Sequence, residues 1–324
     1  PLFFAQVCPS MSRVTLRRGA LVHWVRPSAR LPLPQQLQKL TSLRLADVPQ
    51  LVVLPRETGA TDSRRIAQRS DDGGMSARWR AARRRCFTAG TFSSALGFHG
   101  AKGLREAKRA ADDADRLAAA DTCAELGYLA AGSGQRWGLR HERSGLLTYI
   151  TAWLSFTCPQ ALVSETGFWP FGAADSDGHS YQLGASPDAI VHGADGLHGG
   201  GVLVEVKCPF NDGEPRPHER PFSSFIPQLQ GGLLATGLSH AHLVSWSPFG
   251  ATIFHVRADE SYQAELVQAI ALFLQQNSMK RAQHTARSTL ASVSRHMRAH
   301  SQRLADRAEL IGRIPDTDCV TAEV

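Results

Sequence analysis

Two acidic residues and a lysine in segment 184–209 have the spacing of a hydrolytic metal site. Asp188 lies seventeen positions before Glu205, and Lys207 follows Glu205 by two. Side chains alternate between faces along an extended segment, so Glu205 and Lys207 share one face of a strand at 201–208. If the segment around Asp188 is the neighbouring strand, its carboxylate meets Glu205 across the sheet. The sequence therefore predicts two carboxylates and an amine at one place.

This combination suits the hydrolysis of a phosphodiester. Mg²⁺ prefers oxygen ligands, keeps several waters and bridges to phosphate oxygens, and Mn²⁺ is the alternative ion. Lys207 would orient or deprotonate the attacking water, or stabilise the charge that develops on phosphorus, and the sequence leaves these roles open. An amphipathic hairpin with a solvated charged face is the alternative interpretation of the same pattern.

The elements around this segment alternate between strands and helices. Hydrophobic patterning predicts strands at 160–169, 181–191, 201–208, 241–247 and 251–257, and helices at 91–97, 104–130, 137–153, 223–236 and 260–277, the last capped by Asp259. This order indicates an α/β fold with a central mixed β-sheet flanked by helices.

The motif resembles that of the PD-(D/E)xK nucleases, with Ser-Pro-Asp188 and Glu205-Val-Lys207 as its two halves. Further stretches are similar to motifs of the phage lambda exonuclease and YqaJ-type viral recombinase family: 87–92 with Arg83, 137–142 with Tyr149, 208–210, 226–230, and 246–275. The resemblance covers roughly residues 83–278 and implies a restriction-endonuclease-like core.

The resemblance also implies a role for each matching residue. The implied metal ligands are Asp188, Glu205, the Val206 carbonyl and Glu142, with Lys207 as the catalytic lysine beside Glu205 and Asp188. Arg83, Ser186 and Gln228 correspond to positions that hold the 5′-terminal phosphate of the nucleic acid. Solvated or buried structural roles are the alternatives for Glu142, Arg83 and Gln228.

One position departs from the family pattern. Gly90 stands where the family has a serine whose hydroxyl completes the phosphate pocket, which puts strict dependence on a 5′ phosphate in doubt, although Thr91 is a candidate substitute. Glu165 on the preceding strand either points into the site or caps a strand end.

The net charge of +7 is unevenly distributed. Residues 1–84 hold 15 Lys and Arg against 5 Asp and Glu, and residues 280–313 hold 8 against 2. The core at 85–279 is acidic, with 13 basic against 19 acidic residues. The flanks would supply salt-sensitive attraction to phosphates, or would act as solubilising tails.

These patterns predict three parts of the chain. Residues 1–82 would be a disordered basic leader that fits an organelle transit segment, because the first 46 residues contain seven Lys and Arg and no Asp or Glu. Residues 83–278 would form an exonuclease-like nuclease domain, and 279–324 a basic helical or disordered tail.

Six scattered cysteines, without metal-binding spacing, favour a reducing, intracellular compartment. That compartment would be a mitochondrion or plastid if the leader is a transit segment, and otherwise the nucleus or cytoplasm. No apolar run approaches the roughly 18 residues that a membrane span needs.

The predicted function is that of a Mg²⁺-dependent DNA exonuclease that resects duplex ends in recombination or repair. The alternatives are a structure-specific endonuclease on the same fold and a catalytically silent nucleic-acid-binding protein. The resemblance also allows a homotrimer around DNA and a single-strand annealing protein as a partner.

Overall fold

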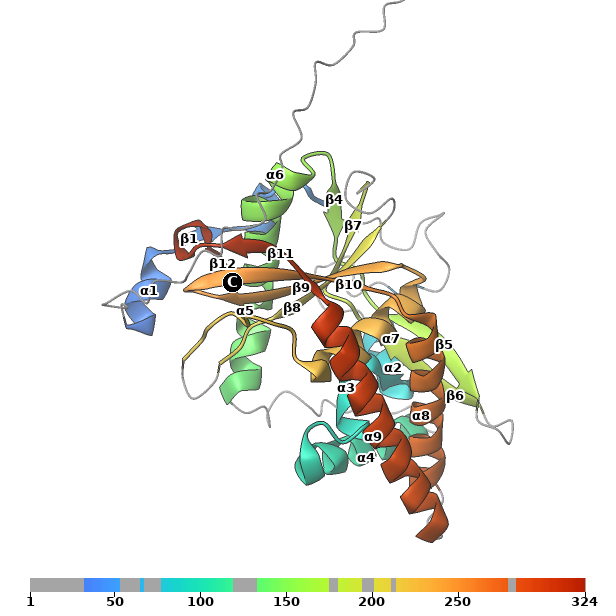
Figure 1. Cartoon of the computed structure of the whole chain (residues 1–324). Helices are drawn as coiled ribbons and strands as arrows, with labels where there is room; N and C mark the ends of the chain where they lie inside the picture. The colour runs from blue at the N-terminus through green and yellow to red at the C-terminus, as the bar shows by residue number, and fades with distance from the viewer. Residues whose placement is uncertain are drawn as a thin grey trace, which may run out of the picture. The chain divides into compact units, whose positions relative to one another are not determined.

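A mixed sheet of seven strands, in the order β11-β10-β9-β8-β7-β4-β2, is the central feature of the computed structural model (Figure 1). Its strands are β2 Leu51–Val52, β4 Leu162–Ser164, β7 Ala189–His192, β8 Val202–Lys207, β9 His240–Ser247, β10 Gly250–Arg257 and β11 Glu309–Ile314. The structure describes residues 32–52, 65–66, 77–118, 133–174, 180–193, 201–210, 214–278 and 284–323. Residues 33–324 belong to one compact unit.

Two smaller sheets and a set of helices complete this unit. The small sheets join β3 Phe87–Thr88, β6 Ser180–Ala185 and β5 Trp169–Ala174, and β1 Thr41–Leu43 with β12 Val320–Ala322. The α-helices are α1 Leu33–Lys39, α2 Ala77–Arg85, α3 Ala89–Ala95, α4 Gly100–Ala118, α5 Ser133–Tyr149, α6 Ser155–Thr157, α7 Ile226–Thr236, α8 Glu260–Ser278 and α9 His284–Arg307. Short helical turns are η1 Leu45–Asp47, η2 Ile150–Leu154, η3 Ser223–Phe225 and η4 Asp316–Asp318.

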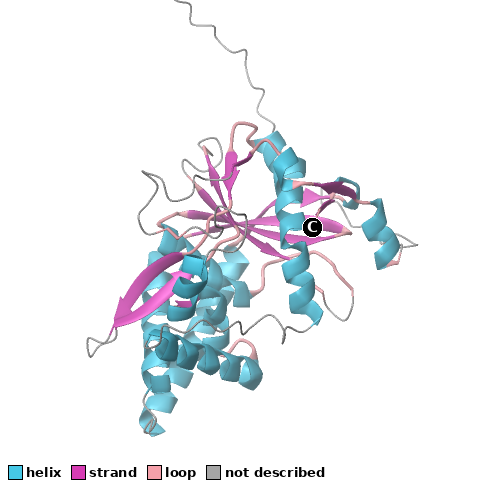
Figure 2. Cartoon of the chain, turned by 180° about the vertical axis from the view of Figure 1, so that it is seen from behind, coloured by secondary structure: helices cyan, strands magenta, loops and turns pink. Residues whose placement is uncertain are grey.

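The alternation along β8 divides the buried core into two clusters. Val202, Val204 and Val206 pack into a cluster with residues of α5, whereas Leu203 packs into another with residues of α3, α7, α8 and α9. Helices thus cover both faces of the sheet (Figure 2), and the predicted α/β class with a central mixed sheet is confirmed.

Small residues allow the helices on each face to approach β8 closely. A Cβ added to Gly145 of α5 would lie 2.5 Å from Val206 Cγ1, and one added to Gly232 of α7 would lie 2.9 Å from Leu203 Cδ1. Real Cβ atoms do not come that close, so a larger residue at either position would push its helix away from the sheet.

The helix termini follow the predicted signals. The Asp259 side chain accepts a 2.8 Å hydrogen bond from the Tyr262 N–H, which confirms Asp259 as the cap of α8. Gly237 ends α7 with a positive φ of 73°, a conformation that glycine adopts without steric cost.

The strand predicted at 181–191 is in fact two strands in two sheets. β6 ends at Ala185 and pairs with β3 and β5, while β7 begins at Ala189 and pairs with β4 and β8. Ser186 and Pro187 separate them, since proline has no N–H for a ladder hydrogen bond. The part of the predicted helix 104–130 beyond residue 118 lies outside the described residues.

The predicted domain boundaries differ from the structure at both ends. β2 adds to the main sheet beside β4, and β11 adds to it beside β10, so residues 33–52 and 309–314 belong to the folded core rather than to a leader or tail. β2 has only two residues, and β11 shows no regular alternation between buried and exposed residues, so neither carries a pattern that identifies a strand. Residues 1–31, 53–64 and 67–76, which together make up most of the predicted leader, are outside the described part of the chain.

Each helix that the structure describes is too short or too polar to cross a bilayer.

Candidate active site

The pairing of β7 with β8 brings Asp188 to Glu205. Ala189 is the register partner of Val204, and the Asp188 N–H donates a 3.2 Å hydrogen bond to the Val204 carbonyl. The Asp188 carboxylate in turn accepts a 2.6 Å hydrogen bond from the Val206 N–H. This contact fixes the carboxylate beside the strand that carries Glu205, as the sequence predicted.

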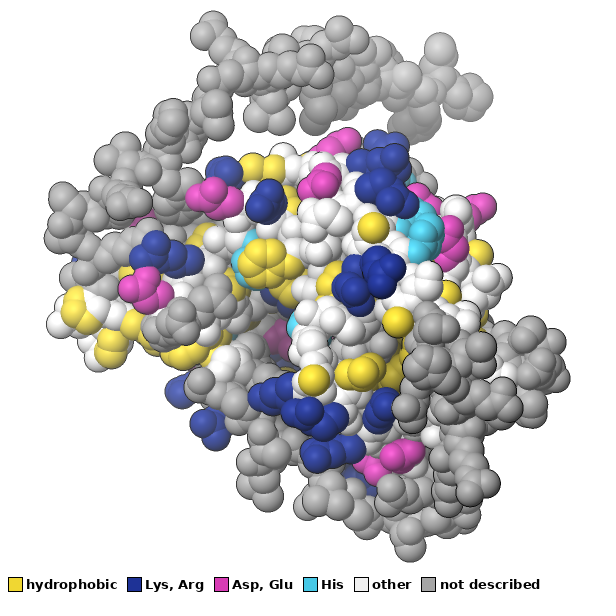
Figure 3. Space-filling view, turned by 60° about the horizontal axis from the view of Figure 1, so that its bottom comes forward, with side chains coloured by type: hydrophobic (Ala, Val, Ile, Leu, Met, Phe, Trp, Pro, Cys, Tyr) yellow, Lys and Arg dark blue, Asp and Glu magenta, His cyan; other side chains and the backbone are white. Residues whose placement is uncertain are grey.

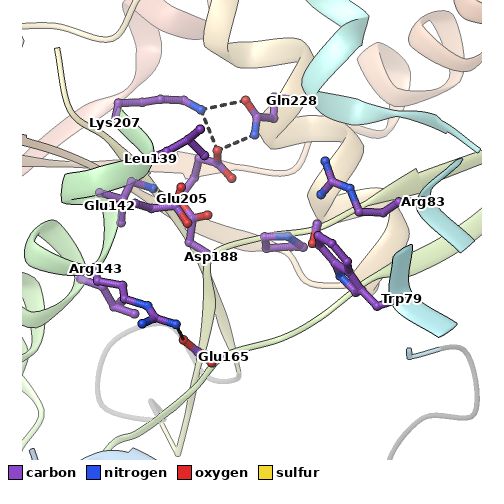
Figure 4. Close-up of a pocket in the computed structure, with 14 residues that line it drawn as sticks. Trp79, Arg83, Leu139, Glu142, Arg143, Glu165, Asp188, Glu205, Lys207 and Gln228 are labelled. Atoms are coloured by element: carbon purple, nitrogen blue, oxygen red, sulfur yellow. Dashed lines mark hydrogen bonds and ion pairs between the residues drawn. The ribbon is translucent and has the colours of Figure 1, made fainter. Parts of the chain in front are cut away.

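Lys207 and Gln228 form a network with Glu205 (Figure 4). The Lys207 ammonium donates to Glu205 Oε1 over 2.7 Å and to Gln228 Oε1 over 2.8 Å. The Gln228 amide also donates to Glu205 Oε1. Glu205 is only 5% exposed, so its charge is balanced by these donors rather than by bulk water.

Glu142 reaches the same place from α5, which covers the opposite face of the sheet from α7. A side-chain hydrogen bond joins Glu142 to Asp188. Glu142, Asp188 and Glu205 thus meet in one cavity, at the place where the sequence predicted a cation.

The electrostatics of the site follow from burial and from the proximity of like charges. Burial, together with the charges of Glu205 and Glu142, raises the pKa of Asp188 well above its ordinary value. Burial also raises the pKa of Glu142, although its hydrogen bond to Asp188 opposes the shift. The cluster therefore resists carrying three negative charges.

Lys207 behaves differently from a buried lysine without partners. Burial alone would lower the pKa of its ammonium, but the carboxylates of Glu205 and Asp188 outweigh that effect, so the pKa lies above its ordinary value. Lys207 is therefore a cation at neutral pH, which makes it a poor acceptor for the proton of an attacking water.

These side chains line a cavity of about 390 Å³. Its lining includes the predicted residues Arg83, Glu142, Ser186, Asp188, Glu205, Val206, Lys207 and Gln228. All eight predicted site residues thus come from distant parts of the chain to one cavity. Arg83 of α2 lies across from the carboxylates, with its guanidinium 4.8 Å from the centre of the Trp79 ring (Figure 4).

A smaller cavity of about 50 Å³ adjoins this one and shares Arg83, Ser186 and Gln228 with it. Gly90 is exposed there, and a Cβ added to it would meet nothing within 4 Å. The Thr91 hydroxyl lies 3.1 Å from the Thr88 hydroxyl and is engaged in that hydrogen bond. The Ser186 hydroxyl donates to the Gly167 carbonyl over 2.9 Å.

Sequence reasoning missed Arg143 and Trp79, which both line the larger cavity. Arg143 forms an ion pair with Glu165 at 3.8 Å, so Glu165 does point into the cavity, one of the two roles left open. Arg143 directly follows Glu142, and the helical position of Glu142 was the available signal. Trp79 precedes the stretch covered by the resemblance and carries no such signal.

Two residues of the motif stretches belong to the core instead of the site. Tyr149 is fully buried and shares a 2.8 Å hydrogen bond with His242 Nδ1. Burial raises the pKa of the Cys208 thiol, and this side chain packs against the α5 cluster, as expected for a packing role.

The donor set fits a hard divalent cation. Three carboxylates face one another at the end of β8, and oxygen ligands are what Mg²⁺ and Mn²⁺ prefer. A divalent ion held by these carboxylates would offset the negative charges of Glu205 and Glu142, which together with burial raise the pKa of Asp188.

Comparisons with known proteins give weak likenesses. No protein-family model and no curated protein matches the chain. The crystal structure of the alkaline exonuclease LHK-Exo from Laribacter hongkongensis is 17% identical, with a TM-score of 0.40 over 71% of this chain and 100% of that chain. LHK-Exo in complex with dAMP is 17% identical, with a TM-score of 0.39 over 72% and 97%. SSO0001 is 17% identical, with a TM-score of 0.28 over 41% and 56%.

Proposed function

We propose that the chain is a Mg²⁺-dependent deoxyribonuclease that degrades DNA from duplex ends. The observation that carries the proposal is the convergence of Asp188, Glu205, Glu142 and Lys207 on one cavity, in the arrangement that phosphodiester hydrolysis requires. The resemblance of residues 83–278 to the lambda exonuclease family favours this reaction over other hydrolyses.

Each residue of the site has a part in the proposed reaction. Asp188, Glu205, the Val206 carbonyl and Glu142 would hold Mg²⁺, which when bound supplies positive charge to the attacking water and to the phosphate. Lys207 keeps its proton, so of its predicted roles we favour orienting the water and stabilising the negative charge on the phosphate over removing a proton. Gln228 holds Lys207 and Glu205 in place by hydrogen bonds to both.

The cavity also contains groups that suit binding of the DNA backbone. Arg83 and Arg143 line it from two different helices, and each offers a planar cation for phosphate oxygens. Figure 3 shows more Lys and Arg side chains gathered in the lower half of one face of the molecule. These charges would offset the acidic core when it meets a polyanion.

One assay tests the proposal. End-labelled linear duplex DNA and covalently closed circular DNA are incubated with Mg²⁺, Mn²⁺, Ca²⁺ or EDTA. Linear DNA should be degraded with Mg²⁺ or Mn²⁺ and remain intact in EDTA, and closed circles should remain intact throughout. Lys207→Ala should lower the rate by at least about 10²-fold, while Lys102→Ala, at an exposed lysine of α4, should not change it. Equal rates in wild type and Lys207→Ala would refute the nuclease assignment.

Two alternatives remain as outcomes of this assay. Cleavage of closed circles would favour a structure-specific endonuclease on the same scaffold, for which the missing hydroxyl at Gly90 is the supporting observation. DNA binding in EDTA without product in any metal would favour a silent nucleic-acid-binding protein. The homotrimer, the annealing partner and the compartment stay predictions.

A further inference from the structure

A second group of potential metal ligands lies far from the carboxylate site in the chain, between α8 and α9. It consists of Glu265 of α8 and of His296 and His300, which are four residues apart on α9. Residues with this spacing lie on one face of a helix, one turn apart. The two helices run side by side (Figure 1), so both imidazoles face the same carboxylate.

The three ligand atoms already converge. His300 Nδ1 lies 2.9 Å and His296 Nε2 lies 3.1 Å from Glu265 Oε2, and the ligand atoms of the three residues all lie within 4.8 Å of one another. Ligand atoms around a tetrahedral zinc ion, at bond lengths near 2.0–2.2 Å, are about 3.3–3.5 Å apart. The two nitrogen–oxygen distances would have to lengthen by a few tenths of an ångström, and the distance between the two nitrogens, which is at most 4.8 Å, would have to shorten by at most about 1.5 Å, a change that side-chain rotation of the exposed His296 can supply.

Neighbouring side chains hold His300 in place, while His296 is open to solvent. The Tyr262 ring packs edge-on against the His300 ring at 5.0 Å, and the Tyr262 hydroxyl is bonded to Ser301 at 2.7 Å, which limits how the His300 ring can turn. The His300 side chain is 12% exposed, whereas that of His296 is 59% exposed and leaves an entry path. Water from the solvent would fill the remaining coordination positions.

We propose that Glu265, His296 and His300 form a binding site for a first-row transition-metal ion of the zinc class. Two imidazoles and one carboxylate suit zinc and its neighbours, whereas Mg²⁺ prefers oxygen alone. On binding, the proton that each of these two nitrogens shares with Glu265 is exchanged through water to the other nitrogen of the same ring, or is released to solvent if the ring was doubly protonated. The freed lone pairs and the Glu265 carboxylate then bind the ion, so two hydrogen bonds are replaced by three metal bonds.

The bound ion would fasten α9 to α8. α9 also contacts α3, through a 2.8 Å hydrogen bond from Arg298 to the Leu96 carbonyl, and it packs against η3 and α7, the helix that carries Gln228. The metal would therefore stabilise the layer of helices on this face of the sheet, and the chain would hold two ions of different chemistry.

Another histidine group in the molecule provides a matched control. His240 Nδ1 lies 2.9 Å from His255 Nε2, while the other nitrogen of the His255 ring faces Glu309 at 3.8 Å. Because the two nitrogens of one imidazole point in opposite directions, this group does not present three ligands to one point. His240→Gln therefore removes an imidazole without removing the proposed site.

The test uses the full chain after removal of metals. Zn²⁺ binding is measured by calorimetry and Co²⁺ binding by its visible absorption, both in excess Mg²⁺. Wild type, His240→Gln and Asp188→Asn should share one high-affinity zinc site. His296→Gln with His300→Gln should weaken it by at least about a hundredfold, because loss of a group outside the ligand set already costs about 10–100-fold.

Thermal unfolding supplies the second measurement. Zn²⁺ should raise the melting temperature of wild type and of His240→Gln, and leave that of the double histidine variant unchanged. The proposal is overturned if the double variant binds Zn²⁺ as tightly as wild type, or if His240→Gln or Asp188→Asn weakens binding equally. None of these readouts depends on nuclease activity, so the two proposals can fail separately.

Discussion

Carboxylates meet nitrogen-bearing side chains in two regions of this molecule, and the regions differ in burial and in donor type. At the end of β8, Glu205 is 5% exposed and contacts Lys207 and Gln228, with Asp188 and Glu142 beside it. Between α8 and α9, Glu265 is 36% exposed and contacts two imidazoles. Because charges interact more strongly away from water, the same kinds of contact decide chemistry in the first region and contribute little stability in the second.

Of the substitutions that test this difference between the two regions, Asp188→Asn in the buried region should have the largest effect. Asparagine keeps an oxygen for the Val206 N–H but removes one of the three acidic groups that are buried beside one another. Nuclease activity should fall by at least about 10²-fold. In EDTA, however, the variant should be more stable than wild type by about 1 kcal/mol, which raises the melting temperature by about 2–4 °C.

Differential scanning calorimetry in EDTA, together with the end-labelled assay, checks both parts of this prediction. Asp113→Asn, at an exposed position of α4, is the control and should change neither quantity. A lower melting temperature for Asp188→Asn would show that the carboxylates do not repel one another as the raised pKa of Asp188 implies.

A smaller effect is expected for Arg143→Ala. Its side chain is 41% exposed and lines the cavity of the candidate site, so on the proposed function we expect it to contact a DNA phosphate. The variant should raise KM by about tenfold without changing kcat, and the slope of log affinity against log salt should decrease by about 1. Arg140→Ala, on the exposed surface of the same helix, is the control. An unchanged salt slope would show that Arg143 serves only to pair with Glu165.

The convergence of Asp188, Glu205 and Lys207 could be predicted because these residues lie in neighbouring segments of the sequence. Alternation places Glu205 and Lys207 on one face of β8, and the nearest available strand brings Asp188 beside them. For Arg143 the only signal was its position next to Glu142, and Trp79 had none, because a cationic or aromatic side chain on a helix has no pattern of its own that distinguishes a cavity from open solvent.

The edges of the fold were unpredictable for a different physical reason. β11 and β2 pair with the two outer strands of the sheet, and their own residues carry little strand signal, since β2 has only two residues and β11 alternates weakly. The Glu265 group is likewise formed by contact between two helices, one of which begins after the predicted domain boundary.

Gly90→Ser should increase the preference for DNA ends that carry a 5′ phosphate, and this effect should be smaller than that of Arg143→Ala. The added side chain meets nothing within 4 Å, so its hydroxyl can project into the small cavity beside Arg83 and Gln228. We expect the preference for ends with a 5′ phosphate over ends without one to increase about threefold, from one exposed hydrogen bond to a charged group.

Gly90→Ala is the matched control, because it fills the same space without a hydroxyl. The measurement compares initial rates on the two kinds of linear end. An equal change in both variants would attribute the effect to the backbone rather than to the hydroxyl.

The smallest effect, a change in the free energy of unfolding without metal, is expected for a substitution of Glu265 between α8 and α9. Hydrogen bonds from His300 and His296 lower the pKa of Glu265, so its ionised form contributes stability that is present above pH 4.5 and is lost as the pH falls through the lowered value. In EDTA, Glu265→Gln should lower the free energy of unfolding by less than about 1 kcal/mol at pH 7, since the group is exposed to solvent. With Zn²⁺ the difference should grow, because the variant lacks one ligand. Urea unfolding at pH 7 and pH 4, with and without Zn²⁺, measures these differences. If Glu265→Gln lost several kcal/mol of stability in EDTA, the exposed contacts of Glu265 would be as strong as buried ones, and the difference in burial would not explain the difference between the two regions.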